Sequence, residues 1–382
     1  MNAGNSVITR IRLYCLSAPV EDAVAMSFSP MTARRSVLVA VETRDGLIGY
    51  GESWVNFPAW ATEERRATLL QGVAPLVLGL DASRITEIHE LLLRRLGPLG
   101  RQWGAPGPIR QAISGLDVAL WDRLGRARGL SVADLAGGPV RERIPAYGSG
   151  LGPSGVAEQA AGCRDAAFGT VKVKVGFGRD TDAENLRVAR EILGPDAEIM
   201  VDANQGWTLP EALQMAPVLR EAGVRVVEEP IAGDRVADLV TFADRTGLSV
   251  ATGENVYGRA DFVPYLTSGA IALIQPDISK TGGLTETIAI AQIARATGTP
   301  VAPHLYGGAV AFAATLQLAA CMPGIAMIEY DVRKNPLRDP LLIDPPVPRS
   351  GTIDLPAGPG LGIELNPDAV RERCEVEESY PQ

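Results

Sequence analysis

From about Arg143 onward, short runs rich in Val and Ile alternate with stretches of helical periodicity. The apolar runs are IPAYGSG, TVKVKVG, EIMVDAN, VRVVEEP, LSVATGEN, IALIQPD, TPVAPH and IAMIEYD. Segments between them, such as AENLRVAREIL and EALQMAPVLREA, have the apolar spacing of amphipathic helices. Eight strand–helix units in succession predict an α/β fold of the (β/α)8, or TIM-barrel, type.

The part of the chain before these repeats has a different pattern. Residues 6–55 alternate apolar and polar positions, and the turn sequence RDG separates two such runs, which predicts an antiparallel sheet containing a hairpin. Residues 63–96 and 109–124 have helical spacing. We therefore expect an α+β domain first, a barrel second, and a Pro- and Gly-rich tail that returns to the first domain.

Composition excludes several classes of partner. The net charge is -9 and the pI is near 5.0, which argues against nucleic acid and anionic membrane surfaces. The first residues lack the apolar core of a signal peptide, and no unbroken apolar run approaches the length of a membrane span. Cys15, Cys163, Cys321 and Cys374 lie far apart without metal-type spacing, which predicts reduced thiols in a cytoplasmic protein.

Polar side chains stand at the ends of successive predicted strands. They are Lys172 and Lys174, then Asp202 and Asn204, Glu228, Glu254, Asp277, His304 and Glu329. From Lys174 onward, the principal positions follow one another at intervals of 23 to 28 residues. Because the carboxyl ends of barrel strands form the active site in this architecture, these side chains are expected to converge at one mouth of the barrel.

Three of these side chains predict a metal site. Asp202, Glu228 and Glu254 would come from adjacent strands, and packed carboxylates repel one another unless a cation lies between them. Oxygen ligands without histidine or thiolate favour a hard divalent ion, Mg2+ first and Mn2+ second. Any one of the three acids could instead cap a helix. Glu229 should point to the opposite face from Glu228 and is a candidate for supporting the metal ligands without binding the ion itself. No nucleotide cofactor is predicted.

The lysines and the histidine are candidates for proton transfer. Lys172 and Lys174 share one face of a strand, so we expect each to lower the pKa of the other. Lys174, nearer the strand end, is the better general base, while Lys172 would tune it and hold an anionic substrate. Taken alone, the sequence KVK indicates a solvated edge strand more often than a pair of functional lysines. His304 ends a strand, and Asp277, one strand earlier, is placed to accept a hydrogen bond from its ring.

Two proton-transfer groups beside a metal suit removal of the proton alpha to a carboxylate, with the metal stabilising the enediolate. Glu329 would add electrophilic help if it were protonated or shared a proton with the substrate carboxylate; otherwise it would pair with a lysine. Trp54, with Phe57 and Trp60 nearby, is predicted to contact the substrate. One of Arg34 and Arg35 could contact a distal carboxylate, although a solvated turn is the simpler interpretation.

The polar strand ends lie in short motifs: KVKVG at 172–176, VDAN at 201–204, VEEP at 227–230, TGEN at 252–255, QPDISKTGG at 275–283 and PHLYGG at 303–308, with GLDVALWDRLGRARGL in the first domain. Together these motifs resemble the mandelate racemase branch of the enolase superfamily. The resemblance implies a capping domain over 1–125 with 350–382, and a barrel over 126–349. It also implies that cap loops, roughly 21–35 and 53–60, close the site.

The resemblance carries the metal ligands, the lysine base, the Asp-His pair and the carboxylate-binding glutamate onto the residues named above. Related branches, the muconate cycloisomerases and succinylbenzoate synthases, place a lysine where this chain has Asp277, which disfavours them. Lys280 lies three residues later and is interpreted as structural.

The function implied by the resemblance is an acid-sugar dehydratase, a hydro-lyase. Lys174 or His304 removes the alpha proton, and protonated His304 assists loss of the beta hydroxyl. A racemase or epimerase of an alpha-hydroxy or imino acid uses the same groups and remains the alternative, and a non-catalytic barrel is a third interpretation. The expected ligand is a small carboxylate. Relatives are commonly homo-oligomers, often octamers, so we expect self-association.

Overall fold

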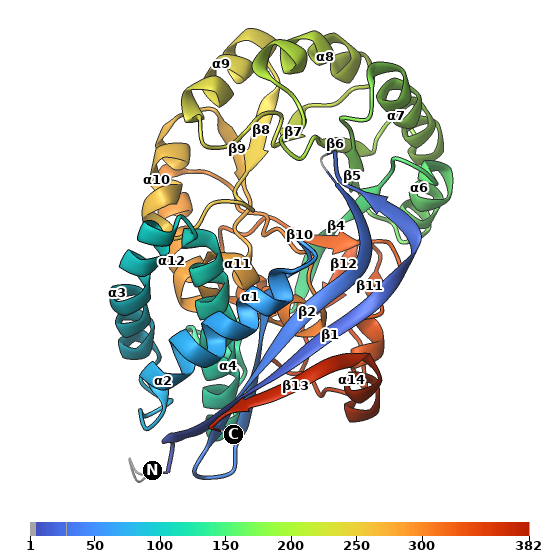
Figure 1. Ribbon diagram of the computed structural model, residues 1–382. Helices are drawn as coiled ribbons and strands as arrows, with labels where there is room; N and C mark the ends of the chain where they lie inside the picture. Colours follow the sequence, from blue (N-terminus) through green and yellow to red (C-terminus); the bar gives the residue numbers. More distant parts are fainter. Residues whose placement is uncertain (1–4, 28, 382) are drawn as a thin grey trace.

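The first sheet of the computed structural model, which describes residues 5–27 and 29–381, is antiparallel with the strand order β13-β1-β2-β3. Its strands are β1 (Ile8–Ala25), β2 (Pro30–Thr43), β3 (Ile48–Trp54) and β13 (Cys374–Tyr380). The predicted RDG hairpin joins β2 to β3, and the Gly46 N–H donates to the carbonyl of Thr43. Because β13 pairs with β1, with Tyr380 opposite Ile11, the last strand lies beside the first (Figure 1).

The helices from α1 to α4 share one hydrophobic core with this sheet. They are α1 (Ala61–Ala67), the π-helical η1 (Thr68–Val73), α2 (Ala74–Val77), α3 (Ile85–Trp103) and α4 (Pro106–Arg128), and the short α5 (Val132–Leu135) that follows packs beside α13 (Ala309–Cys321). Two glycines bring β3 and α4 into backbone contact. A Cβ at Gly49 would lie 2.1 Å from the Ala119 carbonyl oxygen, and one at Gly51 would lie 1.9 Å from that of Gly115. Only glycine permits this approach.

Gly51→Ala is expected to lower the free energy of unfolding by about 3 kcal/mol, because the new methyl group meets backbone atoms that cannot rotate away. Thermal or urea unfolding of the purified chain measures the loss. Gly162→Ala is the matched control, since a Cβ at Gly162 meets no atom within 4 Å. Equal stability of the two variants would contradict this account of the packing.

The second sheet carries the predicted strand–helix alternation. Its order is β11-β12-β4-β5-β6-β7-β8-β9, with β10 paired to β4. The strands are β4 (Arg143–Leu151), β5 (Thr170–Lys174), β6 (Glu198–Asp202), β7 (Val226–Glu228), β8 (Ser249–Thr252), β9 (Ile271–Ile274), β10 (Ile328–Asp331), β11 (Pro348–Arg349) and β12 (Thr352–Asp354). Neighbours from β4 to β9 run parallel, whereas β12 joins β4 antiparallel.

Helices surround these strands. They are α6 (Val156–Asp165), α7 (Arg179–Leu193), α8 (Leu209–Glu221), α9 (Val236–Thr246), α10 (Arg259–Thr267), α11 (Ile278–Thr281), α12 (Gly283–Thr297) and α13 (Ala309–Cys321), followed by η2 (Asp339–Leu341) and α14 (Pro367–Arg373). Figure 1 shows α6 to α10 as an arc outside the strands. Within the described residues, no helix has both the length and the apolarity that a membrane crossing requires.

The predicted seventh strand, TPVAPH, is reduced to a single residue. Val301 forms isolated parallel bridges with Ile274 of β9 and with Ile325. Pro300 and Pro303 flank it, and proline has no N–H to donate to a ladder, so the pairing does not extend. The bridges nevertheless continue the strand order from β9 toward β10. The fold is the predicted (β/α)8-type barrel with an α+β capping domain.

The cap is fastened to the mouth of the barrel by polar contacts. Glu52 on β3 accepts hydrogen bonds from the N–H groups of Gly308 and Ala311, at 2.6 and 2.9 Å, at the start of α13. A carboxylate there satisfies free helix donors. At the tip of the β1–β2 hairpin, the Ser27 hydroxyl donates to the Ala203 carbonyl at 2.9 Å. These contacts place cap residues directly above the strand ends.

Candidate active site

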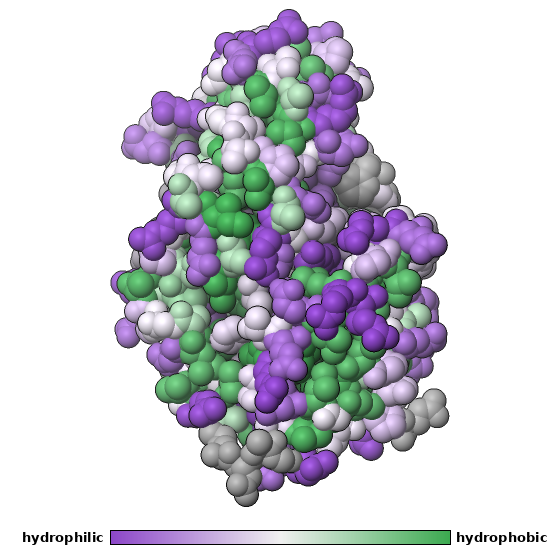
Figure 2. All heavy atoms as spheres, turned by 90° about the vertical axis from the view of Figure 1, so that its left-hand side faces the viewer, coloured by the Kyte–Doolittle hydropathy of each residue, from purple (hydrophilic) through white to green (hydrophobic). Residues whose placement is uncertain are grey.

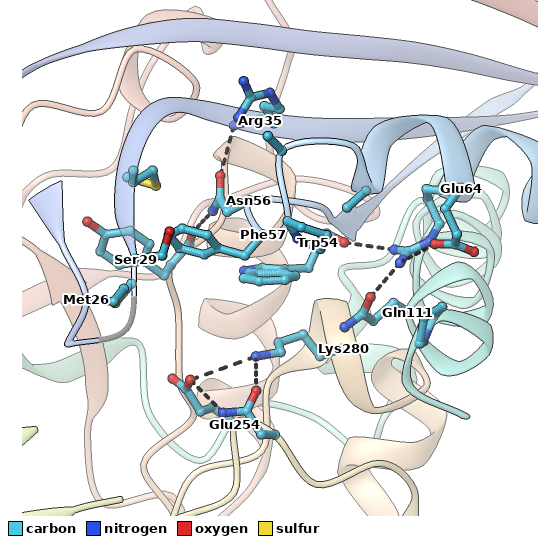
Figure 3. A pocket seen from close by; sticks show the side chains of 18 of the residues that line it. Met26, Ser29, Arg35, Trp54, Asn56, Phe57, Glu64, Gln111, Glu254 and Lys280 are labelled. Atoms are coloured by element: carbon cyan, nitrogen blue, oxygen red, sulfur yellow. Dashed lines mark hydrogen bonds and ion pairs between the residues drawn. The ribbon is translucent and has the colours of Figure 1, made fainter. Parts of the chain in front are cut away.

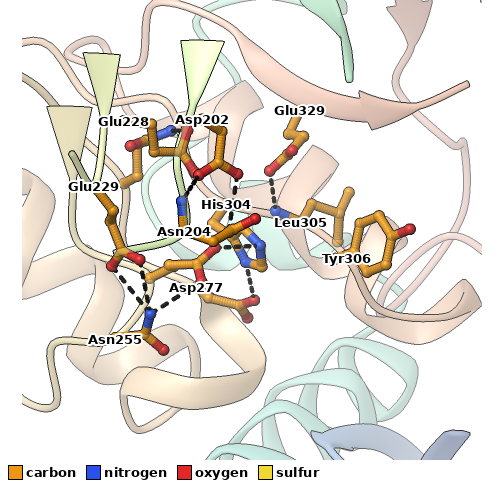
Figure 4. Close-up of polar contacts among 12 residues, drawn as sticks. Asp202, Asn204, Glu228, Glu229, Asn255, Asp277, His304, Leu305, Tyr306 and Glu329 are labelled. Atoms are coloured by element: carbon orange, nitrogen blue, oxygen red, sulfur yellow. Dashed lines mark hydrogen bonds and ion pairs between the residues drawn. The ribbon is translucent and has the colours of Figure 1, made fainter. Parts of the chain in front are cut away.

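The polar strand ends meet at one mouth of the barrel. The register pairs Lys174 of β5 with Asp202 of β6, and Asp202 with Glu228 of β7, so these side chains stand at one level on adjacent strands. Figure 4 shows Asp202, Asn204, Glu228 and His304 directed toward a common centre. The register therefore brings together residues that the sequence separates by a whole strand–helix unit.

Each predicted metal ligand contacts a cationic side chain. The pairs are Lys174 Nζ with Asp202 Oδ2 at 2.6 Å, Lys172 Nζ with Glu228 Oε2 at 2.8 Å, and His304 Nε2 with Glu254 Oε2 at 2.7 Å. Within the part of the chain that the structure describes, no three His, Cys, Asp or Glu side chains form a ready-made metal cluster. Ammonium and imidazole groups neutralise the carboxylates in this arrangement, as their burial requires.

The carboxylates nevertheless suit a hard divalent ion. Glu228 Oε2 accepts hydrogen bonds from Lys172 and from Gln275 Nε2, at 2.8 and 2.5 Å, but Glu228 Oε1 is buried without a hydrogen-bond partner. A buried, unpartnered carboxylate oxygen is costly unless a donor or a cation meets it. Burial raises the pKa of Glu228 to about 7, although Lys172 opposes the shift. The donor set and the free oxygen both fit a cation such as Mg2+.

The predicted mutual lowering of the two lysine pKa values is wrong for this arrangement. Burial acts to lower the pKa of Lys172, but Glu228 and Glu329, both 2.8 Å away, raise it well above its usual value. Burial likewise opposes charging of Lys174, yet Asp202 raises its pKa. Each ammonium group has a carboxylate in direct contact, and this attraction outweighs the repulsion between the ammonium groups.

The predicted Asp277–His304 contact is present. His304 Nδ1 lies 2.7 Å from Asp277 Oδ2, and the other oxygen of Asp277 accepts from the backbone N–H and hydroxyl of Ser279, at 2.7 and 2.6 Å. Asp277 is thus held in place and makes Nδ1 a donor, which directs Nε2 toward Glu254 and the other carboxylates of the mouth. Burial acts to lower the pKa of His304, but Glu254 and Glu329 raise it well above its usual value.

Glu329 is ionised in this arrangement. Its Oε1 contacts Lys172 Nζ at 2.8 Å and accepts from the Ser149 hydroxyl, while its Oε2 accepts from the Leu305 N–H at 2.9 Å. Burial acts to raise the pKa of Glu329, but Lys172 and His304 hold it at about 2. The pairing with lysine, the second of the two roles considered from the sequence, is the one that the structure shows.

Sequence reasoning missed a polar network beside these groups. Asn255 Nδ2 donates to both oxygens of Glu229, at 3.0 and 3.1 Å, and to Glu254 Oε1 at 3.0 Å, while Asn255 Oδ1 accepts from Lys280 Nζ at 3.0 Å. Glu229 does not point away from the site, because it follows the end of β7 with a φ of 40° and strand alternation no longer applies. Burial raises the pKa of Glu229 to about 8.

A pocket of about 910 Å3 lies between the cap and the barrel mouth (Figure 3). The barrel contributes Asn204, Glu254 and His304 to its lining. The predicted loop 53–60 contributes Trp54 and its neighbours, and the loop 21–35 contributes Met26, Ser29 and others; Phe28 lies outside the described residues. Asn204 accepts from Lys174 Nζ at 2.8 Å, consistent with a place beside the substrate.

The arginine pair predicted as a solvated turn lies within β2 instead. Arg34 is buried, forms an ion pair with Asp331, and lies over the Tyr306 ring at 4.7 Å. Arg35 lines the pocket. Arg34 therefore connects the capping domain to the barrel, and its ion pair with Asp331 occupies the charge that was considered for a distal substrate carboxylate.

Comparison with known proteins agrees with this geometry. Residues 9–137 match the mandelate racemase/muconate lactonizing enzyme N-terminal domain, and residues 155–369 match the enolase C-terminal domain-like family. The chain is 32% identical to D-galactarolactone cycloisomerase of Agrobacterium fabrum, over 96% of this chain and 98% of that protein. It is 30% identical to arabinonate dehydratase of Saccharolobus solfataricus, over 97% and 100%.

A solved structure, the mandelate racemase/muconate lactonizing enzyme from Bordetella bronchiseptica RB50, has a TM-score of 0.86 and 34% sequence identity. The match covers 96% of this chain and 100% of that one.

Proposed function

This chain belongs to the mandelate racemase/muconate lactonizing enzyme family, and we propose that it is a Mg2+-dependent hydro-lyase that removes water from a sugar acid to give a 2-keto-3-deoxy acid. The observation that carries the proposal is the Asp277–His304 pair, at 2.7 Å, facing the same mouth as Lys174 and three carboxylates. The relative named as a dehydratase supports it.

The proposed roles follow from the contacts. Lys172 and Asn204 would bind the end of the substrate that carries the carboxylate, and Glu329 would orient Lys172. Trp54 would cover the bound substrate. Asp202, Glu228 and Glu254 would hold Mg2+, with Mn2+ as the second choice, and the ion would stabilise negative charge developing on the substrate carboxylate.

Asp202 and Glu254, which raise the pKa values of Lys174 and His304, would instead pair with Mg2+ when it is bound. Lys174 Nζ or His304 Nε2, in its neutral form, then accepts the alpha proton, as the configuration of the substrate requires. The electron pair of the broken C–H bond forms a C=C bond and expels the beta hydroxyl, which takes a proton from His304 Nε2 and leaves as water. The resulting enol then becomes the ketone.

Proton NMR in deuterated buffer with Mg2+, over a library of sugar acids and smaller alpha-hydroxy or imino acids, tests the proposal. A 2-keto-3-deoxy product is expected. Exchange of the alpha proton with every hydroxyl retained would establish the racemase or epimerase alternative instead. If no compound in the library is converted or exchanges its alpha proton, and Mg2+ does not stabilise the fold, a non-catalytic barrel would be favoured.

A second candidate is cleavage of a ring C–O bond in a cyclic sugar acid. Its alpha-proton step is the same, and the leaving oxygen stays attached to the product. The aromatic lining of the pocket, which includes Trp54, Phe57, Tyr257 and Tyr306, favours a ring-shaped ligand. The relative named D-galactarolactone cycloisomerase supports it. In the same NMR experiment, a keto acid formed without loss of water identifies this reaction.

We also propose that the protein is a cytoplasmic homo-oligomer. All four cysteines are free thiols, which suits a reducing compartment. Large apolar side chains are exposed on α3 (Leu99 and Trp103) and α10 (Val263), helices on the face shown in Figure 2. Light scattering should give a mass that is a multiple of the 40.4 kDa chain, and a monomer would contradict the proposal.

A further inference from the structure

The chain uses lysine rarely. Among its 36 basic residues only four are lysines, and the others are arginines. The lysines are Lys172, Lys174, Lys280 and Lys334. Three of them are buried at the barrel mouth, with 1%, 7% and 1% of the residue exposed in that order, whereas Lys334 is exposed. Because arginine serves as the general cation of this chain, a buried lysine indicates a position that requires a compact ammonium group.

Lys280 differs from the other two buried lysines in its partners. Lys172 contacts two carboxylates at 2.8 Å and Lys174 contacts one at 2.6 Å. Among the described residues, the closest acidic partner of Lys280 is Glu254, whose Oε1 is 4.0 Å from Nζ. That carboxylate is already engaged by His304 at 2.7 Å. The charge of Lys280 therefore lacks a carboxylate in direct contact.

Apart from this long ion pair with Glu254, the closer contacts of Lys280 are with neutral groups. Its Nζ donates to Asn255 Oδ1 at 3.0 Å and lies 4.5 Å from the centre of the Trp54 ring. Figure 3 shows Lys280 reaching beneath the Trp54 indole toward Glu254, inside the pocket. An amide oxygen and an aromatic face attract an ammonium group less strongly than a carboxylate does, so an anion that entered here would gain a strong partner.

Lys280 and Lys172 also come from opposite sides of the barrel mouth, where Lys280 lines the pocket and Lys172 is buried beside Glu228 and Glu329. Lys172 lies on β5, the second barrel strand, and Lys280 follows β9, the sixth. Strands two and six face each other across a ring of eight. A ligand that places one carboxylate beside Lys172 would thus extend across the mouth toward Lys280. Arg34, considered from the sequence for such a distal contact, is already paired with Asp331.

We propose that Lys280, beneath the Trp54 indole, recognises a second anionic group, and that the preferred substrate is a sugar acid carrying a carboxylate at each end. The proposal rests on the proposed function for the identity of the first carboxylate site. It reassigns Lys280 from a structural residue to a specificity-determining one.

Binding of two inert acids tests the recognition without any turnover. Calorimetry with Mg2+ present should show that glutarate binds at least about tenfold more tightly than pentanoate, which has the same length and one carboxylate. Lys280→Met should bring this ratio close to one, and Lys280→Arg should keep part of it because the charge remains. Lys334→Met, at the exposed lysine, should leave the ratio unchanged.

Turnover supplies the second measurement. For a matched pair of sugar acids that differ only in a terminal carboxylate against a terminal CH2OH group, Lys280→Met should lower kcat/KM for the diacid at least about tenfold more than for the monoacid. A purely structural lysine would lower both equally, and that result would overturn the proposal.

Equal binding of glutarate and pentanoate to the unmodified protein would also overturn it, even if Lys280→Met failed to fold. If no sugar acid is turned over, the proposed function fails, while a glutarate preference that depends on Lys280 would still support the anion site.

Discussion

His304→Asn is expected to lower kcat by at least about 10³-fold, because asparagine can keep a hydrogen bond to Asp277 but cannot carry a proton. Lys174→Ala should have a loss of similar size, since no other amine of the described residues lies at Asp202 and Asn204 in its place. Initial rates by NMR, on a substrate found in the library, measure both effects.

The chain offers a matched control for the histidine. It has two histidines, and His89 is buried on α3 with Nε2 3.1 Å from the Gly282 carbonyl, outside the pocket lining. His89→Asn should keep kcat per folded molecule within about threefold of the unmodified enzyme. Mg2+ should still bind to His304→Asn and to Lys174→Ala. Turnover retained in both of these variants would exclude the proposed mechanism.

The strand positions could be predicted because a strand that is buried on both faces needs a short, nearly continuous run of apolar residues in the sequence. Runs such as TVKVKVG and EIMVDAN have β-branched residues in short blocks, and they form β5 and β6. The exception is TPVAPH, which was predicted as a strand but forms only bridges at Val301. Its two prolines interrupt the hydrogen-bond ladder without changing the apolar pattern on which the prediction was based. His304 still reaches the mouth, because the two bridges at Val301 suffice to align the segment.

Which residues meet at the site could be predicted from their spacing, but their ionisation could not. Lys172, along the same strand, does lower the pKa of Lys174, but Asp202, which the register places beside Lys174 on the next strand, raises it by more. Charge balance at this mouth is a property of several strands together. A prediction made one strand at a time therefore assigned the wrong sign to the shift.

The network around Lys280 could not be predicted by the same reasoning. The backbone of Glu229 has a positive φ, which turns its side chain into the site. The alternation of apolar and polar residues does not indicate where a single residue adopts such a conformation. The contact between Trp54 and Lys280 joins two domains whose relative placement depends on anchors such as Glu52. The spacing of residues along the chain predicts which side chains lie on the same face or strand end within one domain. It does not predict a contact between two domains.

Removal of divalent metal is expected to abolish turnover and lower stability, and both should return with Mg2+. The unpartnered Glu228 Oε1 and the raised pKa of that carboxyl group show a buried carboxylate that a cation would stabilise. Mg2+ at about 100 times its Kd should raise the free energy of unfolding by about 2.7 kcal/mol, read as an increase in Tm of a few degrees. Glu254→Gln should lose most of this increase, whereas Glu184→Gln, at an exposed site on α7, should keep it.

The pH dependence of this stabilisation gives the sharper test. Burial raises the pKa of Glu228 to about 7, above its value in the unfolded chain, so the metal-free fold loses stability as the pH rises through about 7. Below that pH the incoming ion must displace a proton from Glu228, and above it the carboxylate is already charged. The increase in Tm caused by Mg2+ should therefore be larger at pH 8 than at pH 6, with proton release on binding greatest at the lower pH. A larger increase at pH 6 would mean that the ion binds elsewhere than at Glu228.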